Sequence, residues 1–104
     1  MNNAIKIKLP NKLHFYSDSR HGWLAVKRKL LHDLGIANQI TVFSYQRGDT
    51  VYLEEDCDAT LFYKTLKSLG FTWDEIEVRI KESYKDHSPI RSFADYEYTE
   101  LPIY

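Results

Sequence analysis

The chain has 104 residues, of which 43% are hydrophobic and 14% aromatic, with a formal net charge of −1 and a single cysteine. This length and composition fit one domain, 1–104, with a buried core, and they argue against intrinsic disorder. One cysteine excludes an intrachain disulfide framework, and no apolar run approaches the ~20 residues of a membrane span. We therefore expect a cytoplasmic protein that has no signal peptide and no contact with membranes.

Charge is distributed unevenly along the chain. Residues 1–32 carry seven Lys or Arg side chains and one Asp, a net charge of +6, whereas residues 33–62 carry one Arg and six acidic side chains, a net charge of −5. If these two regions meet in the folded protein, they neutralise each other. If they lie on separate faces, each face is a candidate surface for a charged partner.

Periodicity in the sequence predicts the secondary structure in chain order. Period-2 alternation and β-branched or aromatic residues indicate strands, and apolar residues three or four apart indicate helices. The expected strands are 5–9, 13–16, 23–26, 40–45 and 50–53, the last two joined by a tight turn at 47–49. The expected helices are 27–34, which ends before Gly35, and a second that begins at Asp56 or Asp58 and ends before Gly70.

Residues 72–85 fit two structures. Thr72 and Glu75 have the spacing of a capping box, which predicts a helix from that point. β-branched residues then alternate with charged ones, which predicts a strand, and we favour a strand over 76–83. Together the elements predict an α+β fold in which two helices cover one face of a small, mainly antiparallel sheet, followed by an acidic, aromatic tail over 94–104.

The acidic run at 54–58 has three interpretations. An EF-hand calcium loop fails, because Ala59 and Thr65 stand where that loop needs Gly and Glu. A transition-metal site lacks paired histidines, so we expect no metal and no cofactor. Carboxylates before a helix N-terminus stabilise the helix dipole, and they also form a candidate contact surface for a protein. The candidate contact residues in this run are Glu54, Glu55, Asp56 and Asp58.

Side chains suited to catalysis are sparse. Cys57 lies among carboxylates that disfavour its thiolate, so we do not expect it to act as a nucleophile. His21 and His87 both occur in turn segments, and if they meet they form an acid–base pair, with Arg91 as a phosphate clamp. Such a site describes a small hydrolase or nuclease, in which the 54–58 carboxylates would hold Mg²⁺. Alternatively, Arg91 forms an ion pair inside the fold, with the 54–58 run as its expected partner.

A short basic stretch follows the third expected strand. Lys27, Arg28 and Lys29, together with lysines near the N-terminus, are a candidate nucleic-acid surface. The sequence pI of about 6.4 lies below that of typical nucleic-acid-binding modules. The sequence also has no RNA-binding aromatic motif, zinc motif or glycine-rich phosphate loop. Nucleic acid is therefore not the partner that we expect first.

Aromatic side chains are abundant, with eight Tyr and two Trp. A core role is expected for Trp23, Phe43, Tyr45, Phe62 and Phe71. Near the C-terminus, aromatic residues alternate with acidic ones that keep the segment in water, which predicts a docking strip or a dimer interface formed by Phe93, Tyr96 and Tyr98. We therefore favour a non-catalytic interaction module whose partner is another protein or a second copy of the chain.

Several short motifs resemble a group of small uncharacterised proteins from phages, plasmids and bacteria. The motifs are His21-Gly22-Trp23-Leu24, Ser44-Tyr45, Gly48-Asp49, the run 52–59 and Ser88-Pro89-Ile90-Arg91, and the similarity spans 18–98. No activity is established for the group, so the resemblance implies no catalytic residue. It implies a protein of a mobile element, and small proteins with an acidic patch in that setting often bind and inhibit a host machine, such as a CRISPR complex.

Overall fold

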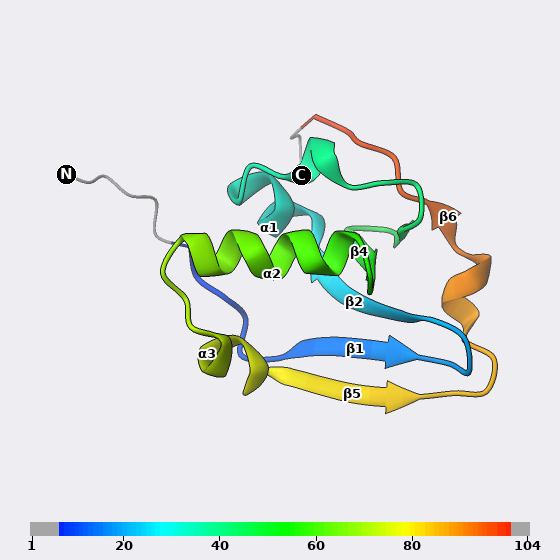
Figure 1. Ribbon diagram of the computed structural model, residues 1–104. Helices are drawn as coiled ribbons and strands as arrows, with labels where there is room; N and C mark the ends of the chain where they lie inside the picture. The colour runs from blue at the N-terminus through cyan, green and yellow to red at the C-terminus, as the bar shows by residue number, and fades with distance from the viewer. Residues whose placement is uncertain (1–6, 101–104) are drawn as a thin grey trace.

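The computed structural model describes residues 7–100 and has an α+β fold (Figure 1). The strands are β1 (Leu13–Ser17), β2 (Gly22–Lys27), β3 (Tyr45–Arg47), β4 (Thr50–Glu54), β5 (Ile80–Tyr84) and β6 (Ala94–Asp95). The helices of the described part are α1 (Arg28–Asp33), α2 (Asp58–Ser68) and α3 (Trp73–Glu77), with 3-10 turns η1 (Ala37–Gln39) and η2 (Pro89–Ser92). None of the helices in residues 7–100 is long and apolar enough to cross a membrane.

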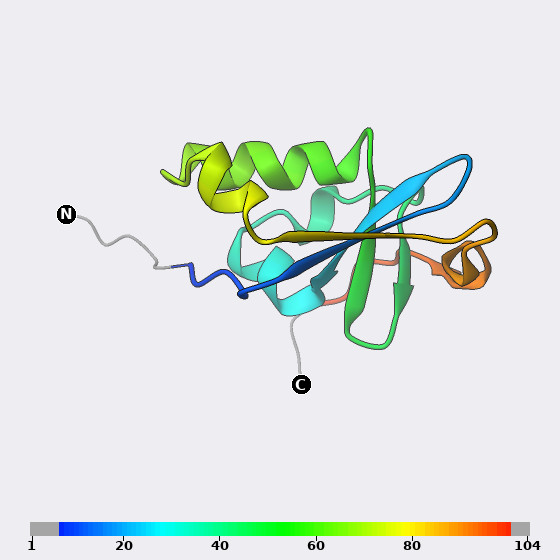
Figure 2. The same cartoon turned by 90° about the horizontal axis from the view of Figure 1, so that it is seen from below.

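The six strands form one sheet in the order β5-β1-β2-β4-β3-β6. β1 and β5 pair in parallel, and the other pairings are antiparallel. Figure 2 shows the β3–β4 hairpin crossing the direction of β1 and β5 at a steep angle, as expected from the twist that accumulates across a sheet. The predicted α+β class with a mainly antiparallel sheet is confirmed.

One face of the sheet packs against the helices. Leu24 of β2 and Leu53 of β4 are partners in register and both are fully buried, in the same core cluster as Phe62 and Leu66 of α2. The spacing of these α2 residues gives that helix its apolar stripe. In Figure 2, α2 and α3 lie on one side of β1 and β5.

The opposite face of the sheet carries the alternate residues of the same strands. We call it the open face, and its central residues are His14, Tyr16, Ala25, Lys27, Thr50 and Tyr52. Because side chains alternate along a strand, burying Leu24 and Leu53 against the helices directs Ala25 and Tyr52 to this second face. The chain of η2 crosses one end of the open face, where Phe93 contacts Tyr52 with ring centroids 5.2 Å apart.

Two predicted strands differ from the structure. Residues 7–9 form no strand, although Leu9 is buried in the core, and residues 5–6 of the predicted strand 5–9 lie outside the described part. The predicted strand 40–45 starts only at Tyr45. The chain before it turns through η1 and a loop at 41–44, because polar contacts from α2 hold that loop away from the sheet.

Residues 72–85 contain both of the alternatives that the sequence left open, one after the other. The capping box is present: Glu75 N donates to Thr72 Oγ1 at 3.2 Å, and Thr72 N donates to the Glu75 carboxylate at 2.7 Å. The favoured strand over 76–83 is therefore wrong at its start, where Ile76 is fully buried from helix α3. Its later half is right, because β5 begins at Ile80.

Gly22 permits the first two strands to pack closely. An added Cβ at this position would meet the Phe15 ring and lie 2.9 Å from a carboxylate oxygen of Glu55. We expect Gly22→Ala to lower the free energy of unfolding by about 1–3 kcal/mol, because the new methyl group would displace the Phe15 ring, which packs against the core. Urea unfolding checks this. In a Phe15→Leu background the same substitution should cost clearly less, and an equal cost would contradict the explanation.

Candidate functional site

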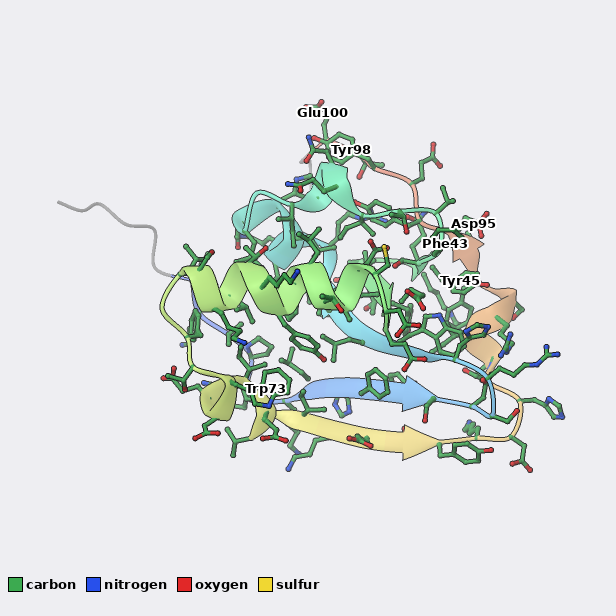
Figure 3. All side chains as sticks on the ribbon, viewed as in Figure 1. Phe43, Tyr45, Trp73, Asp95, Tyr98 and Glu100 are labelled. Carbon is green, nitrogen blue, oxygen red and sulfur yellow. The ribbon has the colours of Figure 1, made fainter. Side chains whose placement is uncertain are left out.

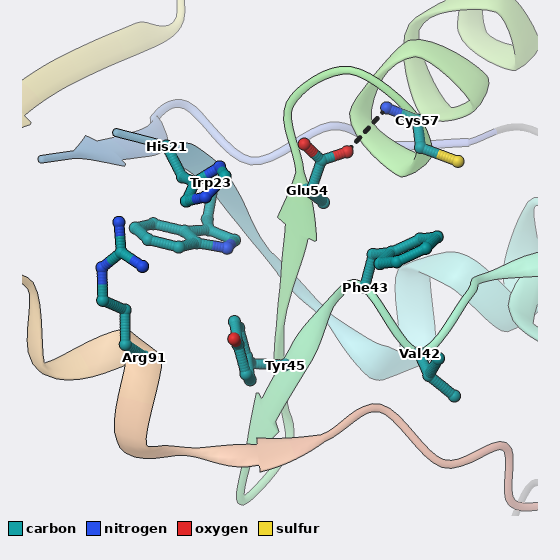
Figure 4. A pocket seen from close by; sticks show the side chains of 8 residues that line it. All are labelled: His21, Trp23, Val42, Phe43, Tyr45, Glu54, Cys57 and Arg91. Atoms are coloured by element: carbon teal, nitrogen blue, oxygen red, sulfur yellow. Dashed lines mark hydrogen bonds between the residues drawn. The ribbon is translucent and has the colours of Figure 1, made fainter. Parts of the chain in front are cut away.

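A groove of about 410 Å³ opens where β2, β3 and η2 approach one another (Figure 4). Its lining residues, which we call the aromatic groove, are His21, Trp23, Val42, Phe43, Tyr45, Glu54, Cys57 and Arg91. The buried Trp23 ring meets the edge of Tyr45 at a centroid distance of 6.1 Å. The guanidinium carbon of Arg91 lies 5.6 Å from the Trp23 ring centroid. The inner wall is therefore a fixed aromatic surface, and polar groups occupy its ends.

Val42 and Phe43 form the exposed rim of the aromatic groove. Their side chains are 66% and 67% exposed. Figure 3 shows Phe43 at the opposite side of the molecule from Trp73 of α3. The predicted core role of Phe43 is wrong. Trp23 and Phe62 are buried as predicted, and the two other aromatic residues expected in the core, Tyr45 and Phe71, are half-buried.

A buried carboxylate fixes the loop that carries this rim. Asp58, 1% exposed, accepts hydrogen bonds at Oδ2 from Thr41 N at 3.0 Å and Thr41 Oγ1 at 2.8 Å. The same oxygen accepts from Ser44 Oγ at 2.5 Å. Ser44 Oγ also accepts a hydrogen bond from Glu54 N at 2.9 Å, which ties the loop to the end of β4. Both ends of the loop are held, so its two middle residues project outward.

The acidic run divides between structural and exposed roles. Glu54 Oε1 accepts from Asp56 N at 3.1 Å and from Cys57 N at 2.9 Å (Figure 4, dashed line to Cys57). Glu54 thus binds two free amides before α2. Asp56 and Asp58 are the predicted N-caps, but the N-cap residue of α2 is Cys57, and its side chain makes no capping hydrogen bond. Asp58 is buried, so its predicted contact role is wrong. Glu54 and Glu55 are half-exposed, and Asp56 is exposed.

The single cysteine has the electrostatic surroundings that the sequence suggested. Desolvation raises the pKa of the Cys57 thiol, and the nearby carboxylates of Asp58 and Glu54 raise it further. A thiol with a raised pKa carries less of the nucleophilic thiolate at neutral pH. Cys57 is therefore poorly suited to covalent catalysis, although it is exposed at the aromatic groove.

Arg91 is held in an ion pair with Asp18. Arg91 Nε donates to Asp18 Oδ2 at 2.6 Å, and a terminal guanidinium nitrogen donates to Oδ1 at 2.9 Å. Asp18 Oδ1 also accepts from the backbone amides of Arg20 and His21, at 2.9 and 3.0 Å. The Arg91 guanidinium holds the pKa of the Asp18 carboxyl well below its ordinary 3.8. The predicted pairing of Arg91 with the 54–58 run is wrong.

The aromatic groove brings together two of the three residues of the hydrolase hypothesis. His21 and Arg91 both line the aromatic groove, but His87 is exposed and is not among the lining residues. The Arg91 guanidinium is already bound by Asp18, so it is not a free phosphate clamp. Among residues 7–100, no three His, Cys, Asp or Glu side chains are grouped closely enough to share a metal ion.

The predicted basic stretch does not act as one surface. Arg28 is buried and donates to Gln46 Oε1 at 2.7 Å and to the Glu97 carbonyl at 3.1 Å, so its predicted role in nucleic-acid binding is wrong. Its exposed neighbours form surface ion pairs: Lys27 with Asp49 at 3.3 Å, and Lys29 with Asp33 at 3.1 Å.

The predicted C-terminal tail begins inside the fold. β6 extends the sheet beside β3, and Tyr96 is buried, with its hydroxyl donating to the Ala37 carbonyl at 2.6 Å. Tyr96 is therefore a core residue and its predicted contact role is wrong. Phe93 is half-buried against Tyr52, and Tyr98 is exposed beside His32 at a centroid distance of 5.7 Å. Residues 101–104 lie outside the described part.

Comparison with protein-family models, with curated proteins and with solved structures finds no match for the chain. The function must therefore be inferred from the site itself. Sequence reasoning missed two features of that site: the exposed rim and the pairing of Asp18 with Arg91. Neither has a local signal, because each depends on partners 14 to 73 residues apart in the chain.

Proposed function

We propose that the chain is a non-catalytic protein-interaction module that binds a partner protein through the aromatic groove and its rim. One observation carries the proposal: two large apolar side chains, Val42 and Phe43, are 66% and 67% exposed beside a groove with aromatic walls. Apolar side chains gathered at a groove often mark protein contacts, and aromatic residues dominate the binding energy of such contacts.

The loop that carries the rim is already ordered. The hydrogen bonds from Thr41 and Ser44 to Asp58 fix both ends of the loop in the free protein. A contact loop that is ordered before binding loses less conformational entropy in the complex. This favours a rigid docking surface over a segment that folds on binding.

The charges around the rim suggest the chemistry of the partner. Glu55 and the exposed Asp56 lie next in sequence to groove residues Glu54 and Cys57, whereas the guanidinium of Arg91 is neutralised by Asp18. A surface with an apolar side chain flanked by basic residues would complement this face. The resemblance to phage and plasmid proteins supports a host machine as the partner, and inhibition of that machine as the outcome.

Phe43→Asp tests the proposal. We expect this substitution to weaken capture of the partner from cells of a bacterial host at least tenfold, because a central aromatic contact typically contributes about 2 kcal/mol or more. Leu69→Asp is the matched control, since Leu69 is 53% exposed beyond the end of α2. Quantitative mass spectrometry compares the two variants with the wild type.

Two outcomes would contradict a partner protein at this surface. One is a partner that the Phe43→Asp variant captures in the same amount as the Leu69→Asp variant. The other is a wild-type chain that is dimeric by light scattering and becomes monomeric with Phe43→Asp, which would assign the surface to a second copy of the chain.

A further inference from the structure

The open face carries a second groove, separate from the aromatic groove. Two adjoining hollows of about 150 and 270 Å³ share Tyr16 and Tyr52 as common walls. They extend from Lys12 before β1 to Lys85 after β5 and have no lining residue in common with the aromatic groove. We call the pair the open-face groove.

Flat rings border the open-face groove. Tyr16 lies 6.3 Å from Tyr52 and 6.1 Å from a stacked His14, measured between ring centroids. On β2, Ala25 lies between His14 and Tyr52 in the strand register, and its small side chain leaves space between the rings. Both tyrosines are half-exposed, so a planar group has access to them.

The charge along this groove is positive. Lys12, Lys27 and Lys85 line it and are exposed, and no carboxylate is found among the described residues that line either hollow. Asp49 forms a surface ion pair with Lys27, in which both side chains are more than 60% exposed. On β5, Lys81 is the register partner of His14 and adds to the same face.

We propose that the open-face groove binds single-stranded nucleic acid. Bases stack on Tyr16 and Tyr52, and the lysines at both ends bind the phosphates. Exposed aromatic rings on a sheet combined with a positive groove suit a single strand, whose base faces are free, and do not suit a duplex, whose base faces are stacked internally. An acidic peptide supplies the charge, but it does not carry a planar ring on every residue, whereas a nucleic-acid strand carries a base on every nucleotide. This activity is additional to protein binding and uses different residues.

Fluorescence anisotropy of the full chain tests the proposal, with labelled 15-nucleotide oligothymidylate and oligouridylate as probes and a duplex of equal length as a control. We expect the single strands to bind and the affinity to fall with salt, with a log–log slope of about −2 for three lysine contacts. Lys12→Glu/Lys85→Glu should weaken binding at least tenfold. The matched control Lys64→Glu/Lys67→Glu makes the same charge change at exposed positions on α2 and should change it less than threefold.

Tyr16→Leu removes a ring but keeps an apolar side chain, and we expect about a tenfold loss of affinity.

Several results would overturn the proposal: no saturable binding at low salt, equal losses in the two charge-reversal variants, or duplex binding as tight as single-strand binding. If polyglutamate displaced the probe as effectively as unlabelled oligothymidylate does, the groove would instead be assigned to an acidic protein. Phe43→Asp should leave nucleic-acid binding unchanged, which separates this test from that of the proposed function.

Discussion

Asp58→Ala is expected to lower the free energy of unfolding by about 3–5 kcal/mol, the largest effect of any substitution near the candidate site. The side chain is 1% exposed, and one of its oxygens accepts three hydrogen bonds from Thr41 and Ser44. Removing the carboxylate leaves the buried Ser44 hydroxyl and the partly buried donors of Thr41 without this acceptor, and each unsatisfied buried group costs about 1–3 kcal/mol.

The neighbouring Asp56→Ala is the matched control for this prediction. Asp56 carries the same charge two residues away but is exposed, so its removal should change stability by about 0.5 kcal/mol or less. Urea unfolding measures both variants, and hydrogen exchange should show faster exchange at the Ser44 amide only in Asp58→Ala. Similar losses in the two variants would mean that the buried carboxylate does not hold the loop.

Asp18→Asn is expected to lower the thermal midpoint by several degrees, because it breaks the pair between a buried carboxylate and Arg91. The Asp18 side chain is 1% exposed and that of Arg91 is 34% exposed, so the pair is better shielded than the surface pair of Lys29 with Asp33. Asp33→Asn is therefore the control, and it should have little effect, as is usual for an exposed helical pair.

The same pair predicts how stability depends on pH. Arg91 lowers the pKa of Asp18 in the folded state, whereas in the unfolded chain this carboxyl has its ordinary value near 3.8. The unfolded state therefore binds more protons in acid. The stabilisation is complete above about pH 5 and is lost progressively as the pH falls below that value. Asp18→Asn should flatten the acid side of the stability profile, and an unchanged acid slope would contradict this assignment.

The sequence predicted those elements whose signals are local. The helix that ends before Gly70, the hairpin around 47–49 and the capping box of Thr72 and Glu75 all follow from residues close together in the chain, and all three are present. The favoured strand from 76 failed because tertiary burial of Ile76 outweighs the alternation of the following residues.

The candidate site could not be predicted, because its geometry depends on long-range contacts. Val42 and Phe43 have the composition of a strand, and only the hydrogen bonds from their neighbours to Asp58 hold them out of the sheet. Alternation of acidic and aromatic residues suggested that Tyr96 is exposed, but β6 places it in the core.

Site-specific photocrosslinking tests the central claim, that the chain meets its partner at the rim of the aromatic groove. A photoreactive phenylalanine analogue is placed at Phe43 in one variant and at the control position Leu69 in another, and both are expressed in a bacterium, the kind of host that the proposed function assigns. We predict a covalent adduct with one host protein from position 43 and little of it from position 69, with loss of the position-43 adduct when unlabelled wild-type chain is in excess. An adduct that forms equally at both positions, or only at position 69, would contradict the assignment.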